Sequence, residues 1–340
     1  MSALAIVAPG LHTTIQDRGR FGYQADGVPV SGALDGECFE IANRLAGNAA
    51  DTPALELIYQ GPTFEVAADS VRVALAGAGA ELELLNPASR RLGGWRSATF
   101  VRGERFRLQG VGASAYLAIA GGIAVAPVMG SASTFVRGGF GGWQGRALRA
   151  GDVLPLHRDS VEEQCELALS DPPDLGLDRP IRLVLGPQQD HFTEAATEIL
   201  LSAEFTVSKQ ADRMGLRLDG PTLPHRGDYN IVSDGIATGA IQVPGSGQPI
   251  LLLADHQTTG GYPKIATVIS TDLPLLGRRR PGDRIHFVAV DVAEAERARR
   301  EQRAALDARL ATIAPVRSGG LDLDRLFGAN LISGVVFDNP

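Results

Sequence analysis

A dense group of polar residues in the C-terminal half has the residue types needed to read an amide. The apolar segment PILLLA (249–254) runs directly into DHQTTGGYPK (255–264). Gln242 and Gln257 each carry an acceptor oxygen and an NH2 donor, which suits a planar amide or ureide whose C=O and N–H both need partners. Asp255 can act as a base or hold a cation, and Lys264 offers a positive charge to a carboxylate or a developing oxyanion. The pattern therefore predicts a small-molecule site at the end of a buried strand.

The same residues also fit a purely structural interpretation. Thr258, Thr259 and the two glycines that follow suit a tight hairpin, and Asp255 and Gln257 can satisfy local backbone groups. His256 fits a structurally paired or exposed histidine better than a catalytic one. The residues alone favour the ligand site only slightly, so both interpretations stay open.

A second polar cluster lies near the N-terminus, in the segment TTIQDRGRFG (13–22). Arg18 and Arg20 can hold a carboxylate or phosphate. Alternatively, Asp17 and one of these arginines form an ion pair around a turn, and the sequence favours neither. Ser31 is expected to cap the helix that follows it. We expect the glycine-rich segment RGGFGG (137–142) to be a hairpin rather than a flexible flap or an anion-binding nest.

Several common kinds of site are excluded by the sequence. It contains no GxxxxGK[ST] phosphate loop, no GxSxG elbow and no HExxH zinc motif, and Cys38 and Cys165 have no metal-ligand spacing, so we expect no metal site. A net charge of -7 without a basic run argues against nucleic acid. The start MSALAIVAPG lacks the features of a signal peptide, and the uncharged segment 108–136 is interrupted by glycines and Pro127. We therefore expect no membrane span and a cytoplasmic location.

The elements that must position these residues are mostly short strands. Apolar runs separated by Gly and Pro turns predict a mainly β fold with a few helices, of the α+β class. Strands are expected at 71–75, 116–120, 181–185, 250–253 and 285–290, and helices at 35–46, 191–201 and 291–313. We expect a β-rich N-terminal half (1–157), an acidic, proline-rich linker (158–180), a second β half (181–290) and a C-terminal helix and tail (291–340). The apolar patch LISGVVF in that tail is expected to dock on the body or on a partner.

Long motifs across most of the chain resemble one known family. They are TTIQDRGRFGYQ, GVPVSGALD, ANRLAGN, ALELIYQGPTFEV, STFVRGGFGGWQGRALRAGDVLPL, LGPQQDHF, SDGIATGAIQVP, LADHQTTGGYPKIATVISTDL and PGDRIHF. Together they are similar to the biotin-dependent carboxyltransferase family, also called allophanate hydrolase subunit 2-like or KipA-like, which includes the C-type subunit of 5-oxoprolinase. The resemblance runs from about Thr13 to Phe287.

The resemblance implies two cyclophilin-like β-barrel units and a partner of the KipI-like type, which is the B-type subunit of 5-oxoprolinase. With a third, LamB/YcsF-like protein of the A type, such chains form an ATP-dependent 5-oxoprolinase that opens 5-oxoproline to L-glutamate. The sequence has no Met-Lys-Met biotinylation loop, so any biotin must arrive on a separate carrier protein. ATP is likewise expected at the level of the complex rather than in a phosphate loop of this chain.

The leading hypothesis is the C-type subunit of a 5-oxoprolinase, inactive when isolated. Its expected catalytic residues are Asp255, Gln257 and Lys264, and its expected substrate-binding residues are Gln242, Thr258, Thr259, Arg18 and Arg20. One alternative is half of a carboxyltransferase that acts on urea or another amide with carboxybiotin. The other is a non-enzymatic regulatory partner of a KipI-like protein.

Overall fold

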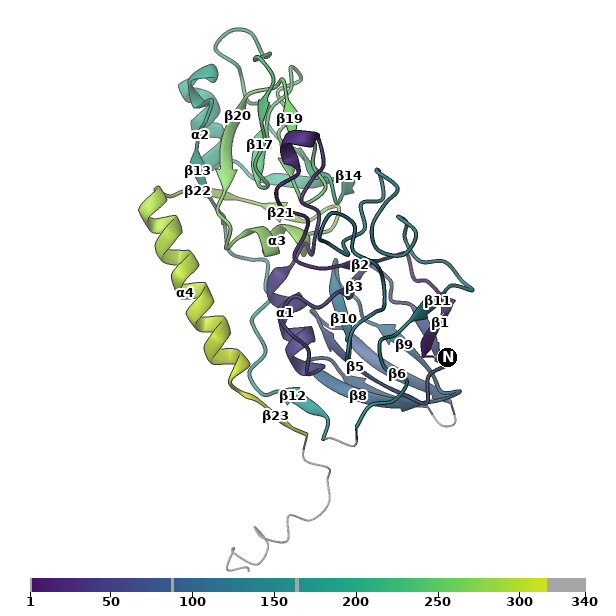
Figure 1. The fold of residues 1–340 in the computed structure, drawn as a ribbon. Helices are drawn as coiled ribbons and strands as arrows, with labels where there is room; N and C mark the ends of the chain where they lie inside the picture. The colour runs from purple at the N-terminus through teal and green to yellow at the C-terminus, as the bar shows by residue number, and fades with distance from the viewer. Residues whose placement is uncertain (1, 87–88, 163–164, 317–340) are drawn as a thin grey trace, which may run out of the picture.

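Two β units, each with its own apolar core, form the body of the protein (Figure 1). The computed structural model describes residues 2–86, 89–162 and 165–316. The predicted tail patch LISGVVF lies outside the described residues. The mainly β class is confirmed, with four α-helices among the described residues.

The N-terminal unit is built from two antiparallel sheets that face each other. The first has the order β11-β1-β4-β9-β6-β7 and the second the order β2-β3-β10-β5-β8-β12-β23. The first sheet comprises β1 (Ala3–Ala8), β4 (Thr63–Val66), β6 (Glu81–Asn86), β7 (Arg90–Gly93), β9 (Arg105–Gln109) and β11 (Val153–Pro155). The second comprises β2 (His12–Gln16), β3 (Ala54–Ile58), β5 (Ser70–Ala76), β8 (Arg96–Val101), β10 (Ala115–Ile119), β12 (Leu167–Leu169) and β23 (Ile313–Pro315).

The two faces of strand β5 pack into two different apolar clusters. Its residues Val73 and Leu75 point into the core between the sheets, whereas Ala74 and Ala76 belong to a separate apolar cluster under helix α1 (Gly36–Leu45). Successive strand residues face opposite sides of a sheet, and the small alanines let the helix approach closely. Helix α1 begins after Asp35, whose carboxylate accepts hydrogen bonds from the backbone N–H groups of residues 37 and 38. Asp35, rather than the expected Ser31, is therefore the cap.

The C-terminal unit is an eight-stranded sheet that nearly closes into a barrel. Its order is β21-β14-β15-β18-β17-β20-β13-β22. The strands are β13 (Ile181–Leu185), β14 (Phe205–Asp212), β15 (Gly215–Asp219), β17 (Ala240–Gln242), β18 (Ile250–Leu252), β20 (Lys264–Val268), β21 (Arg284–Ile285) and β22 (Phe287–Ala289). The two edge strands β21 and β22 are separated only by His286, so the two edges of the sheet lie next to each other. The single strand expected at 285–290 is therefore split between the two edges.

Shorter elements complete this unit. They are the helices α2 (Glu194–Ser202) and α3 (Leu273–Gly277), the ribbon of β16 (Asp234–Gly235) with β19 (Thr259–Gly260), and the single turn η2 (Gln189–His191). A further single turn, η1 (Gln24–Asp26), lies between β2 and α1 in the sequence. The sequence did not predict α3. Its apolar Leu275 and Leu276 reach the barrel core.

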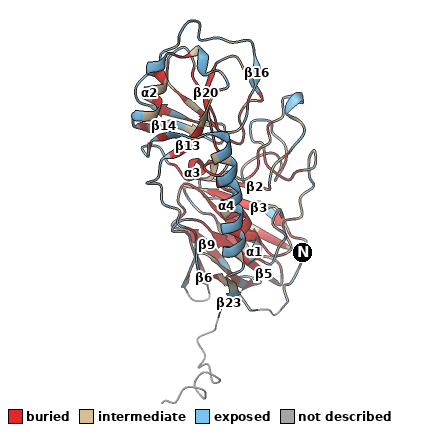
Figure 2. Ribbon diagram, turned by 90° about the vertical axis from the view of Figure 1, so that its left-hand side faces the viewer, coloured by how far each residue is buried: buried red, intermediate tan, exposed pale blue. Residues whose placement is uncertain are grey.

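The C-terminal segment returns to the N-terminal unit. Helix α4 (Val292–Leu310) runs along the outside of the molecule, largely exposed, and passes α1 (Figures 1 and 2). Arg303 of α4 pairs with the buried Glu40 of α1 at 2.9 Å, and Leu306 packs into the cluster under α1. After α4, strand β23 pairs with β12, which lies within the segment 158–180 that was expected to be a linker. Leu167–Leu169 of this segment is therefore part of the second sheet.

Candidate functional site

A cavity in the C-terminal unit contains both predicted amide-reading glutamines. This cavity, here called the glutamine cavity, has a volume of about 650 Å³. Such a volume is typical of small-molecule sites. It lies beside the β14–β15 hairpin and is lined by Arg137, Lys209, Gln210, Ala211, Asp212, Met214, Gly215, Arg217, Gln242, Ile250, Leu252, Gln257, Gly260, Gly261 and Tyr262.

Gln242 and Gln257 form a pair with free hydrogen-bonding capacity. Gln242 ends strand β17, and its side-chain N–H donates to the carbonyl of Tyr262 at 3.2 Å. Gln257 donates from Nε2 to Oε1 of Gln242 at 3.2 Å. The buried Oε1 of Gln257 has no hydrogen-bond partner among the described residues. Since each NH2 group has two protons, the pair can both donate to a ligand carbonyl and accept from a ligand N–H.

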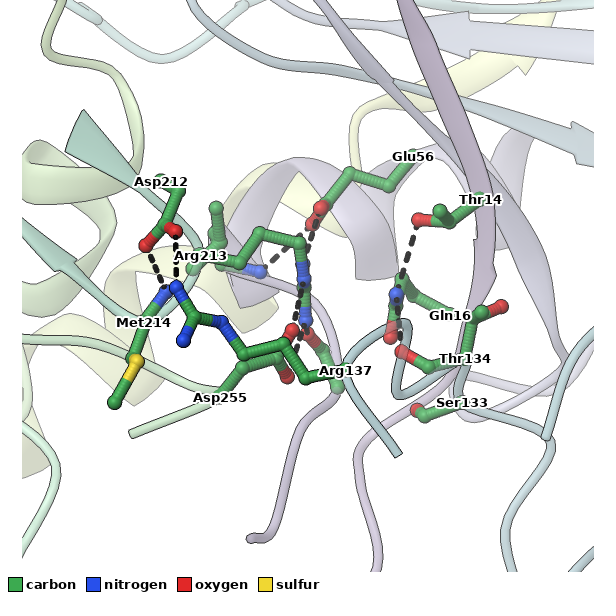
Figure 3. A network of polar contacts seen from close by, with 12 residues as sticks. Thr14, Gln16, Glu56, Ser133, Thr134, Arg137, Asp212, Arg213, Met214 and Asp255 are labelled. Atoms are coloured by element: carbon green, nitrogen blue, oxygen red, sulfur yellow. Dashed lines mark hydrogen bonds and ion pairs between the residues drawn. The ribbon is translucent and has the colours of Figure 1, made fainter. Parts of the chain in front are cut away.

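Cationic side chains surround the same cavity. Lys209 and Arg217, both exposed, make no ion pair among the described residues. Arg137 comes from the glycine-rich segment of the N-terminal unit and pairs with Asp212 at 3.0 Å, as Figure 3 shows. A ligand that combines an amide with a carboxylate would thus meet an amide reader and positive charge in one cavity.

Asp255 lies instead in a buried ion network between the two units (Figure 3). Arg213 donates from Nε to Asp255 Oδ2 at 2.9 Å and from Nη2 to Oδ1 at 3.3 Å. Arg213 also pairs with Glu56, which is fully buried on β3 of the N-terminal unit. The second oxygen of Glu56 accepts from the hydroxyl of Tyr116 at 2.6 Å. Both oxygens of Asp255 therefore accept hydrogen bonds from Arg213, the residue that joins the two units through Glu56.

The electrostatics of this network agree with that role. Burial disfavours the charged form of Arg213, but Glu56 and Asp255 together hold its pKa above the ordinary value. Burial, reinforced by Glu56, raises the pKa of Tyr116 well above its usual range. Arg213 is therefore a cation and Tyr116 a neutral hydrogen-bond donor at any physiological pH.

A smaller cavity of about 370 Å³ borders this network and shares Arg137, Ala211, Asp212 and Met214 with the glutamine cavity. We call it the interface cavity, because His12 of one unit and Asp255 of the other line it. Burial lowers the pKa of His12, whose Nδ1 has no partner among the described residues.

Lys264 and the two threonines point to structural contacts rather than to the glutamine cavity. The ammonium of Lys264 is buried and pairs with Asp234 at 2.8 Å, and it also donates to the carbonyl of Gly235 at 3.2 Å. Thr259 is an exposed residue of the β16–β19 ribbon, and the carbonyl of Thr258 accepts from the N–H of Ile236. The structure thus ties Lys264 to strand β16 of the β16–β19 ribbon.

The two N-terminal arginines do not lie at the glutamine cavity. Arg20 is fully buried, donates to the carbonyls of Val128 and Ser133 at 2.9 Å, and lies over the ring of Phe140. Arg18 pairs with Glu40 at 3.0 Å and lines a separate cavity beside α4. Arg20 therefore anchors the loop that carries Arg137, and Arg18 belongs to another part of the molecule.

His256 lies between Asp255 and Gln257 but makes only internal contacts. It is fully buried, with Nδ1 2.6 Å from the carbonyl of Gln257 and Nε2 3.1 Å from the hydroxyl of Thr238. Because a carbonyl only accepts, Nδ1 carries the proton and donates, so Nε2 accepts from Thr238. Burial lowers the pKa of His256, which keeps the ring neutral. The imidazole fixes the backbone at Gln257.

Sequence reasoning missed several residues of these sites. Glu56 had a usable signal, since it is a lone carboxylate inside the apolar strand ALELI, and a buried charge requires a partner. Arg213, Lys209 and Arg217 gave no such signal, because arginine and lysine residues on strands and turns are usually exposed to solvent.

Among the described residues, no three His, Cys, Asp or Glu side chains gather as a metal-ion site. No helix in the described part of the chain is long and apolar enough to cross a membrane.

Comparisons with known proteins place this architecture in a family. The family described as carboxyltransferase domain, subdomain A and B, matches residues 26–289. The chain is 42% identical over 305 residues to the C-type subunit of 5-oxoprolinase from Escherichia coli strain K12, covering 88% of this chain and 95% of that protein. It is 35% identical to the corresponding 5-oxoprolinase subunit of Haemophilus influenzae, covering 86% of this chain and 93% of that protein.

A solved structure gives the same result. The crystal structure of the urea amidolyase of K. lactis matches with a TM-score of 0.81 and 30% identity, over 95% of this chain but only 20% of that much longer chain. The chain therefore belongs to the family of the carboxyltransferase domain, subdomain A and B.

Proposed function

We propose that this chain is the C-type subunit of a cytoplasmic, ATP-dependent 5-oxoprolinase complex and that its glutamine cavity binds the lactam. The observation that carries the proposal is the Gln242–Gln257 pair, with its unsatisfied buried acceptor, in a cavity rimmed by cations. Two relatives that match along nearly their whole length are named as the C-type subunit of 5-oxoprolinase, which supports a role in a hydrolase complex.

Each polar group of 5-oxoproline finds a complementary group among the residues that line this cavity. In a five-membered lactam the C=O and N–H lie on the same side, so one side-chain amide pair can engage both. Gln257 Oε1 would accept from the lactam N–H, and a free N–H of the pair would donate to the carbonyl oxygen. Lys209 and Arg217 would hold the carboxylate.

Ring opening breaks the lactam C–N bond and forms a C–O bond to water, giving L-glutamate. A donor on the carbonyl oxygen stabilises the negative charge that develops there as the oxygen of water adds. ATP hydrolysis in the complex supplies the driving force. The residues of this chain bind, orient and polarise the lactam, while Asp255 and Lys264 hold the cavity walls through their ion pairs.

The proposed complex includes KipI-like and LamB/YcsF-like partner proteins. The decisive experiment is to co-express the three proteins and measure ATP-dependent glutamate release from 5-oxoproline, omitting each protein in turn. We expect activity only when all three are present, so the isolated chain is inactive.

Matched glutamine variants test the site itself. Gln257→Ala and Gln242→Ala should each lower glutamate release at least tenfold, because each removes hydrogen bonds to the lactam, worth about 1–3 kcal/mol apiece. Gln248→Ala is the control, since Gln248 also has a buried, unpartnered Oε1 among the described residues but lies outside the cavity. Full activity of both cavity variants in an assembled complex would remove the site assignment.

Carboxyl transfer is the second candidate function, favoured by the likeness to urea amidolyase. Urea and the ureido ring of biotin both present the N–H and C=O groups that the glutamine pair can read. In this case biotin would arrive on a separate carrier protein. Turnover of urea that depends on such a carrier, without glutamate release, would replace the first proposal with this one.

A further inference from the structure

A second cavity is lined mostly by residues far from Gln242 and Gln257 in the sequence. Some of its polar side chains have no hydrogen-bond or ion-pair partner among the described residues. This cavity, here called the helix cavity, has a volume of about 430 Å³. It lies where α1, α4, the segment 31–34 and the C-terminal unit meet. Its lining residues are Arg18, Ser31, Ala33, Leu34, Gly36, Glu37, Glu40, Thr238, Leu253, Ala254, Ser270, Leu273, Pro274, Arg299, Gln302, Arg303 and Leu306.

Ser31 is the clearest sign that this cavity is built for a ligand. The residue is only 5% exposed, yet its hydroxyl has no hydrogen-bond partner among the described residues. Its backbone is held in the left-handed region at φ 56° by a hydrogen bond from its N–H to the carbonyl of Ala254 at 3.0 Å. That conformation costs a residue other than glycine about 1 kcal/mol. A strained backbone thus holds a residue of the cavity lining whose buried hydroxyl is unsatisfied among the described residues.

Thr238 adds an acceptor on the opposite unit. Its hydroxyl proton is donated to Nε2 of His256, because the imidazole uses its only proton on the carbonyl of Gln257. The oxygen of Thr238 therefore retains lone pairs for a ligand and has no proton to give. A ligand that contacts Thr238 must bring its own N–H or O–H.

The charges of the lining leave an arginine unmatched. Glu40 is paired with Arg18 and Arg303. Glu37 is paired with two arginines outside the lining, at 3.3 Å each. Arg299 makes no ion pair among the described residues. Positive charge is thus left over, and a guanidinium binds a carboxylate well.

We propose that the helix cavity is a second binding site, for a small carboxylate that carries a hydroxyl or amino group. The carboxylate would pair with Arg299 and accept from the hydroxyl of Ser31, and the ligand's O–H or N–H would donate to Thr238. This site is separate from the lactam site, so the proposal does not depend on the proposed function.

The test is a ligand-observed NMR titration of the full chain with two matched pairs of probes. L-Lactate is compared with propionate, and L-glutamate with glutarate, because each second compound lacks only the donor group. We expect L-lactate or L-glutamate to bind about tenfold more tightly than its analogue. Equal binding within both pairs, or no binding of either donor-bearing probe, would overturn the proposal.

Variants locate the bound probe. Ser31→Ala, Thr238→Val and Arg299→Gln should each weaken binding about tenfold. Ser114→Ala is the matched control for Ser31, since Ser114 is equally buried and, among the described residues, also has an unpartnered hydroxyl, but does not line this cavity. With L-lactate, which is not a product of the proposed reaction at the glutamine cavity, Gln257→Ala should leave the affinity unchanged. If only Gln257→Ala weakens binding, the probe occupies the glutamine cavity and the helix cavity is not a site.

Discussion

At the scale of single residues, Asp255 and Gln257 are two positions apart yet serve different purposes. Gln257 lines the glutamine cavity and has a buried acceptor oxygen without a partner among the described residues, whereas Asp255 is held by Arg213 between the units. The intervening His256 fixes the backbone of Gln257 by donating to its carbonyl, while the N–H of Asp255 donates to the carbonyl of Arg213. Substitutions at the two positions should therefore have different consequences.

We predict that Asp255→Asn lowers stability rather than acting only on turnover. The change leaves the buried Arg213 and Glu56 network with one carboxylate fewer, and breaking a buried ion pair from one side costs about 3–5 kcal/mol. Urea unfolding followed by circular dichroism measures the loss. Asp69→Asn is the control, because the Arg102–Asp69 pair is exposed and its removal should leave the unfolding midpoint in place. An Asp255→Asn protein as stable as the parent would contradict this role.

At the scale of elements, the glycine-rich loop is held in place by one buried arginine. Arg20 donates to Val128 and Ser133 and lies 4.9 Å from the ring centroid of Phe140. Gly141 and Gly142 have positive φ, and a Cβ at either would collide with the 133–134 backbone or side chain. The loop thus presents Arg137 to the glutamine cavity as a fixed group.

We predict that Arg20→Lys loosens this loop without unfolding the protein. A lysine ammonium cannot reproduce the planar guanidinium fork that bonds several carbonyls at once. Amide hydrogen exchange in residues 128–142 should become at least tenfold faster, while exchange in the barrel strands β13 and β20 stays the same. Unchanged exchange in 128–142 would show that the glycines alone define the loop.

The turn before β11 should make stability depend on pH. Hydrogen bonds from Arg146, helped by the N–H of Arg149, lower the pKa of Asp152 to about 2 from 3.8. A carboxyl whose folded pKa lies below its unfolded pKa stabilises the protein above about pH 4, and this contribution is lost as the pH falls toward 2. We expect Asp152→Asn to reduce the slope of unfolding free energy against pH between 4 and 2. A slope as steep as that of the parent protein would assign the acid sensitivity to other groups.

At the scale of the whole molecule, buried ion pairs tie the two units together. Arg213 joins Glu56, and Arg278 joins Asp35 at 2.6 Å, in both cases across the units. Helix α4 adds a further connection through Arg303 and Glu40. Units coupled in this way should unfold together.

We predict a single calorimetric transition for the parent protein and two for Arg278→Met. The substitution leaves Asp35, 1% exposed, without its guanidinium partner, so the interface should fail before the separate cores do. Arg284→Met is the control, because Arg284 is largely exposed and its loss should preserve one transition. A single transition in Arg278→Met would show that the other contacts suffice to couple the units.

The sequence by itself determined the local structure. Alternating apolar residues and Gly/Pro turns predicted strands such as β5, β10 and β13 close to their observed bounds. The long charged helix also lies where its pattern placed it, because helix periodicity and an Asp cap are local signals. The family could likewise be inferred from the sequence, and the prediction that Gln242 and Gln257 share one site agrees with their common cavity.

Only the tertiary structure decided which polar residues share a cavity. The sequence grouped Asp255, Gln257 and Lys264 because they are neighbours along the chain. Side chains of successive strand and turn residues point in different directions, so the three face the unit interface, the glutamine cavity and the ribbon. Conversely, Arg137 and Lys209 reach one cavity from different units. Such contacts depend on burial and ion pairing between residues far apart in the sequence, so no local sequence pattern predicts them.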